Sequence, residues 1–109
     1  MSVFKSIAED KILFRGELFF IVEDNYPVSP GHLLIISHSD KPDYFSLSDN
    51  EKTDLPRMIQ KAKSLIEEKH SPDGFNIGMN CGESAGQTVM HFHCHVIPRF
   101  QGDVDDPRG

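Results

Sequence analysis

The sequence predicts an α+β fold in which one main helix packs on an antiparallel sheet of five strands. Three observations lead to this prediction. Short segments rich in Val, Ile, Leu and Phe recur along the chain and are joined mostly by short connections with Gly and Pro. Only one long segment has apolar residues at helical spacing. The 109 residues contain no repeat, linker or low-complexity stretch, so a single domain over residues 1–109 is expected.

The strands follow from their β-forming residues and from the turns between them. Residues 12–15 and 18–23 predict a hairpin around Gly16. Residues 26–31 predict a turn, because two prolines fix φ and remove N–H donors. The remaining predicted strands are 32–37, 75–80 and 89–98.

The predicted helix begins at a capping box. Ser48 and Glu51 have the spacing at which each side chain bonds the other residue's backbone N–H, and the helix is expected to reach about Lys69. Pro56 lies inside it and predicts a kink or the separation of the first turns. The apolar positions that repeat at helical spacing are Leu55, Met58, Ile59, Ala62, Leu65 and Ile66.

Three histidines at alternate positions, His91, His93 and His95, are the strongest functional signal in the chain. Alternate residues of a strand share a face, so the three imidazoles are predicted to lie side by side. The opposite, apolar face is predicted to belong to the core and consists of Met90, Phe92, Cys94 and Val96.

Three interpretations of these histidines compete. They can belong to an ordinary solvent-facing strand, to a metal site with His91 and His93 as ligands, or to a catalyst that attacks phosphorus through a neutral imidazole. The preceding loop favours catalysis. Its neutral side chains Asn80, Gln87 and Thr88 suit an anionic oxygen, and its glycines allow a ligand to approach the backbone closely.

Two segments resemble those of the histidine-triad (HIT) proteins, which are nucleotide hydrolases and transferases. Residues 87–99 look like the family signature of histidines alternating with hydrophobic residues. Residues 24–36 resemble its second characteristic segment, where Gly-His follows a Pro-rich turn and opens a strand. The resemblance implies a HIT-like fold, a nucleotide substrate and a two-fold homodimer with a continuous sheet.

The resemblance also implies a double displacement at the α-phosphate of an adenine nucleotide conjugate. His93 is then the nucleophile that forms a nucleotidyl-histidine, and His95 stabilises charge on the α-phosphate. His91 and His32 are expected to form a buried network behind the nucleophile, and a backbone carbonyl near His91 is expected to fix the tautomer of His93.

Strand parity, together with the resemblance, assigns the substrate-binding residues. Asp24 shares a face with Val22 and is expected to bind ribose hydroxyls, while Val22 and Leu34 form part of an apolar slot for the base. Asn80, Gln87 and Thr88 are expected to hold phosphate, leaving-group or ribose oxygens.

The segment Gly-Gln-Thr-Val at residues 86–89 resembles the Fhit-like branch of the family more than the other branches. Members of this branch cleave dinucleoside polyphosphates such as Ap3A and Ap4A. Alternatives are a Hint-like adenosine 5'-monophosphoramidase and a non-catalytic nucleotide-binding module. Relatives in the phosphoramidase branch carry an N-terminal Cys-x-x-Cys that helps to bind zinc, whereas residues 2–5 are Ser-Val-Phe-Lys. No structural metal and no required cofactor are therefore expected, and Mg²⁺ or Mn²⁺ is expected only with a polyphosphate substrate.

Composition agrees with a small cytoplasmic enzyme. The net charge of −6 and the pI near 5.4 argue against a nucleic-acid partner. The apolar runs are too short for a membrane span, and the N-terminus lacks a hydrophobic signal region. Cys81 and Cys94 are expected to be free thiols in a reducing compartment. A homodimer is expected, because a 12.3 kDa chain with a sheet edge and a wide apolar helix face gains from burying both.

Overall fold

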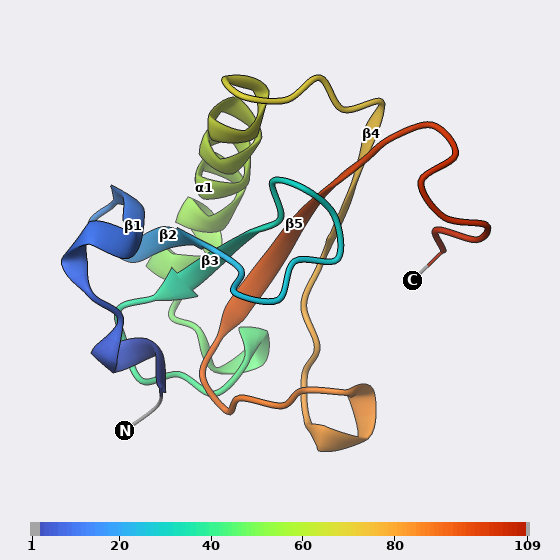
Figure 1. The fold of residues 1–109 in the computed structure, drawn as a ribbon. Helices are drawn as coiled ribbons and strands as arrows, with labels where there is room; N and C mark the ends of the chain where they lie inside the picture. Colours follow the sequence, from blue (N-terminus) through green and yellow to red (C-terminus); the bar gives the residue numbers. More distant parts are fainter. Residues whose placement is uncertain (1–2, 109) are drawn as a thin grey trace.

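A computed structural model describes residues 3–108, except for the side chains of Val3 and Lys5, and contains a five-stranded antiparallel sheet and one α-helix, α1 (Asp49–Glu67) (Figure 1). The predicted fold class is confirmed. The expectation of no structural metal depends on segment 2–5, of which Ser2 and the side chains of Val3 and Lys5 lie outside the described part of the chain. The strands, in the sheet order β1-β2-β3-β5-β4, are β1 (Ile12–Arg15), β2 (Phe19–Glu23), β3 (Leu33–Ser37), β5 (His93–Arg99) and β4 (Gly74–Gly78). Short 3₁₀ turns are η1 (Val3–Ser6), η2 (Glu9–Lys11), η3 (Tyr44–Ser46) and η4 (Glu83–Ala85).

Helix α1 begins as predicted. The Glu51 N–H donates to Ser48 Oγ at 3.2 Å, and the Ser48 N–H donates to Glu51 Oε1 at 2.7 Å. The helix is not split at Pro56, so that part of the prediction is wrong. Proline removes a single i→i−4 bond, and Pro56 lies on the exposed side of a helix whose other side is held by buried Leu55 and Met58.

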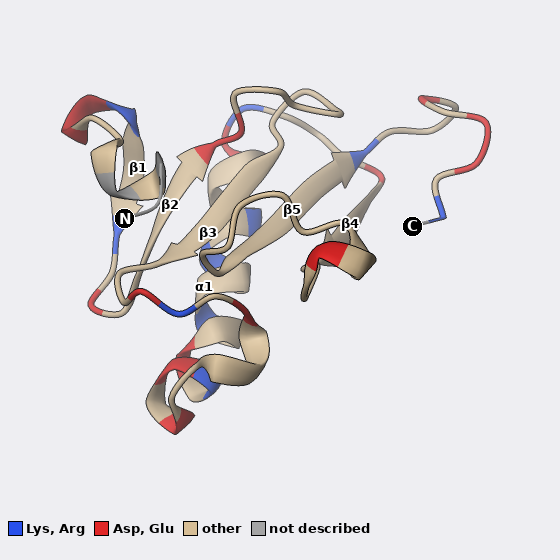
Figure 2. Cartoon of the chain, turned by 90° about the horizontal axis from the view of Figure 1, so that it is seen from below, with Lys and Arg blue, Asp and Glu red and all other residues tan. Residues whose placement is uncertain are grey.

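The sheet has two different faces. On one, the core side chains of β2, β3 and β5 pack against Leu55, Met58, Ala62 and Ile66 of α1, which lies on this side of the sheet in Figure 2. The other face carries a smaller apolar cluster, and Phe4, Ile7 and Ile12 pack against it. The residues of this second cluster are Phe20, Val22, Leu34 and Ile36.

Strand β5 begins at His93, four residues later than predicted. Its pairing with β3 ends at the pair Ile36–His93, and β3 itself ends one residue further on. The preceding backbone contacts a loop instead, since the Phe92 N–H donates to the Lys41 carbonyl at 2.7 Å. The Phe92 carbonyl still accepts the N–H of Ser37, the last residue of β3, at 3.4 Å, but residues 89–91 lie beyond the end of β3 and are not part of a strand. Met90 is exposed rather than in the core, whereas the other three predicted core residues of this segment are buried.

Other strand boundaries also differ from the predictions, by one residue at the start of β2 (Phe19) and at the end of β5 (Arg99). Strand β3 begins at Leu33, because the His32 N–H closes a turn by donating to the Ser29 carbonyl at 3.1 Å. Strand β4 runs over Gly74–Gly78 instead of 75–80. The register that follows from these boundaries places the functional side chains.

Charged residues avoid the centre of the sheet. In β2, β3 and β5 they occur only at Glu23 and Arg99, each at a strand end (Figure 2). Within residues 3–108, no helix combines the length and the apolarity that a membrane span requires.

Candidate active site

Strand register places histidines in two rows that cross the face opposite α1. Val22 pairs with Leu34, and Leu34 pairs with His95. The next row consists of Phe20, Ile36 and His93. Each imidazole thus stands at the end of an apolar row, and a pocket of about 1000 Å³ opens beside it, lined by His93, His95, Val22 and Leu34 among others.

The hydrogen bond of His93 determines where its free lone pair lies. Nδ1 is 2.9 Å from the backbone carbonyl oxygen of His91. A carbonyl oxygen only accepts, so Nδ1 carries the proton and the neutral ring has its lone pair on Nε2. Phe4 packs edge-on against this ring at a centroid distance of 5.1 Å. The geometry is that of an oriented, unprotonated nitrogen on a residue that lines the pocket.

A second chain of hydrogen bonds determines the tautomer of His95. The Val28 N–H donates to Nδ1 of His32 at 3.2 Å, so the neutral His32 carries its proton on Nε2. This Nε2–H lies 2.9 Å from Nδ1 of His95 and donates to it. His95 then carries its own proton on Nε2, which can donate to a bound oxygen.

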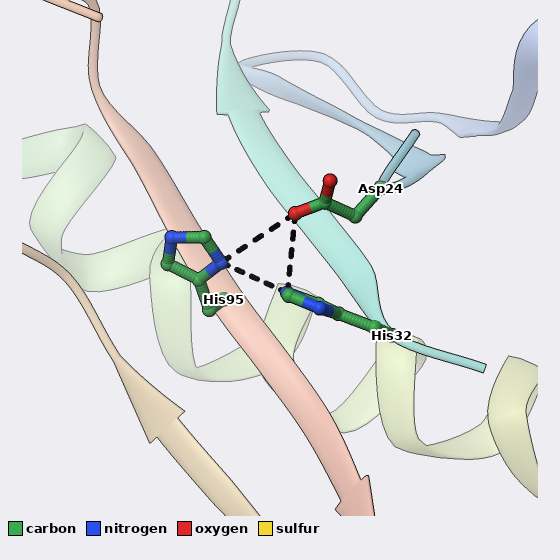
Figure 3. A group of neighbouring side chains, drawn as sticks. All are labelled: Asp24, His32 and His95. Carbon is green, nitrogen blue, oxygen red and sulfur yellow. Dashed lines mark hydrogen bonds and ion pairs between the residues drawn. The ribbon is translucent and has the colours of Figure 1, made fainter. Parts of the chain in front are cut away.

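Asp24 lies beside this pair, although it is far from His95 in sequence. Its backbone N–H donates to the His32 carbonyl at 3.1 Å, which closes the β2–β3 connection. Oδ1 accepts the Tyr26 N–H at 2.8 Å, and Oδ2 lies 3.4 Å from His32 Nε2 and 3.9 Å from His95 Nδ1 (Figure 3). The carboxylate is thereby held at the edge of the pocket.

Burial keeps the two linked histidines neutral. The pKa of His95 is lowered to about 4, chiefly by desolvation and also by the nearby His93 and His32, while Asp24 acts in the opposite direction. Desolvation also lowers the pKa of His32, and again Asp24 acts in the opposite direction. The hydrogen bonds from Val28 to His32 and from His32 to His95 require both imidazoles to be neutral.

His91 supports the site from outside the strand. Its ring is 2% exposed, and Nε2 donates to the Ser37 carbonyl at 2.8 Å. Phe4 contacts this ring edge-on as well. The three histidines are therefore not one row of equivalent groups, because His91 precedes β5 and contributes its carbonyl to His93.

Gln87 supports the loop before β5. Oε1 accepts the Gly82 N–H at 2.7 Å, and Nε2 donates to the carbonyls of Pro42 at 2.6 Å and Val89 at 2.9 Å. The side chain is 5% exposed, and it does not line the pocket. Its amide is engaged by backbone, so the geometry does not favour the predicted contact of Gln87 with phosphate.

Asn80 and Thr88 are exposed residues that line the pocket. Asn80 Nδ2 donates to the Gly86 carbonyl at 3.3 Å, and Gly86 has a φ of +89°. A side chain at Gly86 would be strained by that φ and would approach the Asn80 amide to 3.3 Å. The absence of a side chain at Gly86 thus allows Asn80 to pack against its backbone at the rim of the pocket.

The N-terminal segment forms a wall of the pocket that was not predicted from the sequence. This segment lines the same pocket as His93 and His95 through Phe4, Ile7, Lys11 and Leu13, together with other residues of η1 and η2. Only the apolar pair Phe4 and Ile7 at a spacing of three signalled that this segment packs, and that pattern is too short to predict a partner.

Fold and site together define a histidine-triad protein. The chain belongs to the HIT domain family, whose profile matches residues 5–102. It is 38% identical over 98 residues to the AP-4-A phosphorylase of Mycobacterium tuberculosis, which covers 89% of this chain and 50% of that protein. It is 37% identical over 100 residues to the bis(5'-adenosyl)-triphosphatase of Dictyostelium discoideum, covering 92% and 67%. The chain thus spans about half the length of the mycobacterial relative.

Solved structures agree with the fold. A HIT family member from Bacillus subtilis superposes with a TM-score of 0.86 at 28% identity, over 99% of this chain and 79% of that one. The NitFhit protein of Caenorhabditis elegans superposes with a TM-score of 0.84 at 33% identity, over 94% of this chain and 24% of that one.

Proposed function

We propose that this protein hydrolyses dinucleoside polyphosphates such as Ap3A and Ap4A through a covalent nucleotidyl-His93 intermediate and releases a nucleoside monophosphate. The hydrogen bond from His93 Nδ1 to the His91 carbonyl is the observation that carries the proposal, because it leaves Nε2 as the lone-pair nitrogen. Support for the substrate class comes from relatives named for Ap4A and bis(5'-adenosyl) triphosphate chemistry.

In the first step, the lone pair of His93 Nε2 attacks the α-phosphorus, and the bond from that phosphorus to the bridging oxygen breaks. The leaving polyphosphate takes the electron pair of that bond. His95, with its proton on Nε2, donates to an oxygen on the α-phosphate as charge builds there. In the second step, water attacks the same phosphorus, the P–N bond breaks with its electron pair returning to Nε2, and the extra water proton passes to solvent. Throughout, His93 Nδ1–H stays bonded to the His91 carbonyl.

The other lining residues bind the nucleotide. Asp24 accepts from the ribose hydroxyls, while Val22 and Leu34 form an apolar surface for the base. Asn80 and Thr88 hold phosphate or leaving-group oxygens at the rim. Among the described side chains, Lys11 is the one cationic residue of the lining, so charge is stabilised mainly by hydrogen bonds and by any Mg²⁺ or Mn²⁺ that a polyphosphate carries.

We also propose a cytoplasmic homodimer. Strand β4 is an outer strand of the sheet, and Ile77 on it is 51% exposed, which suits pairing with a second copy. Leu65 and Ile59 on α1 are only partly buried in the chain's own core. The free thiols of Cys81 and Cys94 are consistent with a reducing compartment.

A substrate panel read by product mass tests the proposal. It contains Ap3A, Ap4A, AMP-morpholidate and a nucleotide sugar, and each is quenched in alkali, which preserves a phosphoramidate, to trap a mass increase of one nucleotidyl group on the peptide with His93. Cleavage of Ap3A or Ap4A with such an adduct is the expected result. Cleavage of the morpholidate alone would assign the chain to phosphoramidate chemistry, and binding of every compound without turnover would contradict an enzymatic role.

A further inference from the structure

Asp24, His32 and His95 place three metal-ligating atoms at one point of the fold (Figure 3). These are Asp24 Oδ2, His32 Nε2 and His95 Nδ1, and their separations are 2.9, 3.4 and 3.9 Å. Zinc bonds of about 2.0–2.1 Å in a tetrahedron require ligand atoms about 3.3–3.4 Å apart. The three atoms therefore approximate one face of a tetrahedron, and a small shift of each would complete it.

We propose that this cluster binds one Zn²⁺ ion, with a fourth position open to the pocket. Two imidazole nitrogens and one carboxylate oxygen form a ligand set that suits zinc better than Mg²⁺, which prefers oxygen ligands. The site differs from the pair His91 and His93 that the sequence suggested, since His91 Nε2 is engaged by the Ser37 carbonyl. It also differs from an Mg²⁺ ion that arrives with a polyphosphate.

The surroundings hold the ligands in place before a metal arrives. His32 is 3% exposed, and the Asp24 N–H bonds its carbonyl. The Tyr26 N–H fixes Oδ1 of Asp24, which directs Oδ2 toward the two rings. Asp24 and His95 line the pocket, from which an ion and a fourth ligand can enter.

Metal binding must change the tautomer of His32. The neutral His32 carries its proton on Nε2, so the ion takes that position and the proton moves to Nδ1, where it ends the bond from the Val28 N–H. Val28 is a surface residue, and its N–H loses this acceptor when the metal binds. His95 keeps its tautomer, because the ion binds Nδ1, and its second ring nitrogen points away from the cluster in Figure 3.

The consequence for activity rests on the proposed function. Zinc would occupy Oδ2 of the Asp24 carboxylate, the group that we assign to the ribose hydroxyls, while leaving the Nε2–H of His95 available. The ion is then a competitor of the nucleotide, which raises the apparent KM and leaves kcat unchanged at saturating substrate.

Calorimetric titration of the full chain with ZnCl₂, and Co²⁺ absorption in the d–d region, test the site without any turnover. We expect one Zn²⁺ per chain and tetrahedral cobalt bands, with affinity lowered about 10-fold or more in Asp24→Asn, His32→Gln and His95→Gln. His93→Asn and His70→Gln are matched controls that should bind as the native chain does, and His70→Gln should also keep its activity. Circular dichroism identifies any variant that fails to fold, and the half-buried His95 offers the mildest of the three changes.

Each alternative outcome is informative. Absence of stoichiometric binding, or equal loss in His93→Asn, would overturn the site. Binding that leaves KM unchanged would overturn the competition for Asp24. Binding by a chain that turns over no nucleotide would contradict the proposed function and leave the metal site standing.

Discussion

Gln87 offers a sharp test of whether a polar residue beside the histidines serves the substrate or the scaffold. Its side chain accepts the Gly82 N–H and donates to the carbonyls of Pro42 and Val89, and it is 5% exposed. Replacement by Ala leaves one backbone donor and two acceptors without their partner. At about 0.5–1.5 kcal/mol for each of the three bonds, the free energy of unfolding should fall by about 1.5–4.5 kcal/mol.

Urea unfolding followed by circular dichroism measures this loss, with an unchanged m value as the check that both variants unfold from the same compact state. Thr88→Ala is the matched control, because it removes an exposed polar side chain one residue away, and it should change stability by less than about 0.5 kcal/mol. A Gln87→Ala variant that is as stable as the native chain but has a raised KM would refute the reasoning. That result would support the prediction that Gln87 contacts the phosphate of the substrate.

Other predictions concern catalysis, protonation and assembly. His93→Ala should lower turnover by about 1000-fold or more with nucleotide binding retained, as measured by single-turnover kinetics and calorimetry, and activity above about a tenth of native would exclude it as the nucleophile. Burial raises the pKa of the Cys94 thiol to about 12, so a thiol reagent at pH 8 should label only Cys81 in the native chain, and rapid labelling of both would contradict the packing. Desolvation raises the pKa of Glu51, but hydrogen bonds from Ser39 and Ser48 outweigh it, so the pKa is lowered in the folded chain. The ionised carboxylate therefore stabilises the fold at pH values above its unfolded pKa. This contribution is lost as the pH falls through the folded pKa. Glu51→Gln should therefore cost stability at pH 7 and progressively less in acid below about pH 4.5, which urea titrations across pH can check. Light scattering at micromolar concentration should give the mass of two chains, and a single-chain mass at every dilution would exclude the dimer.

Local sequence patterns determined much of this protein. The capping box at Ser48, the hairpin around Gly16 and the alternation of Phe92, Cys94 and Val96 into the core were all readable, because each depends on residues a few positions apart. The same alternation singled out His93 and His95, and the expected carbonyl partner of His93 is where the structure has it.

Strand ends and side-chain partners depended on the tertiary structure. A strand exists only where another strand accepts its hydrogen bonds, so the start of β5 was decided by the end of β3 and not by residues 89–92. Gln87 was predicted to be a substrate ligand because the sequence does not reveal that its Nε2 lies 2.6 Å from the Pro42 carbonyl oxygen. The N-terminal wall was missed for the same reason, since the partner of Phe4 is a ring 89 positions further along the chain.

The cluster of Asp24, His32 and His95 separates what the sequence determines from what the tertiary structure determines. The sequence alone determined that Asp24 and His32 stand at the two ends of a Pro-rich turn and that His95 lies on a histidine-bearing strand. Only the pairing of β3 with β5 brought His95 within 2.9 Å of His32, 63 residues away. Residue types and local periodicity are properties of the chain, whereas distances between strands follow from register, which the competition among all possible pairings decides.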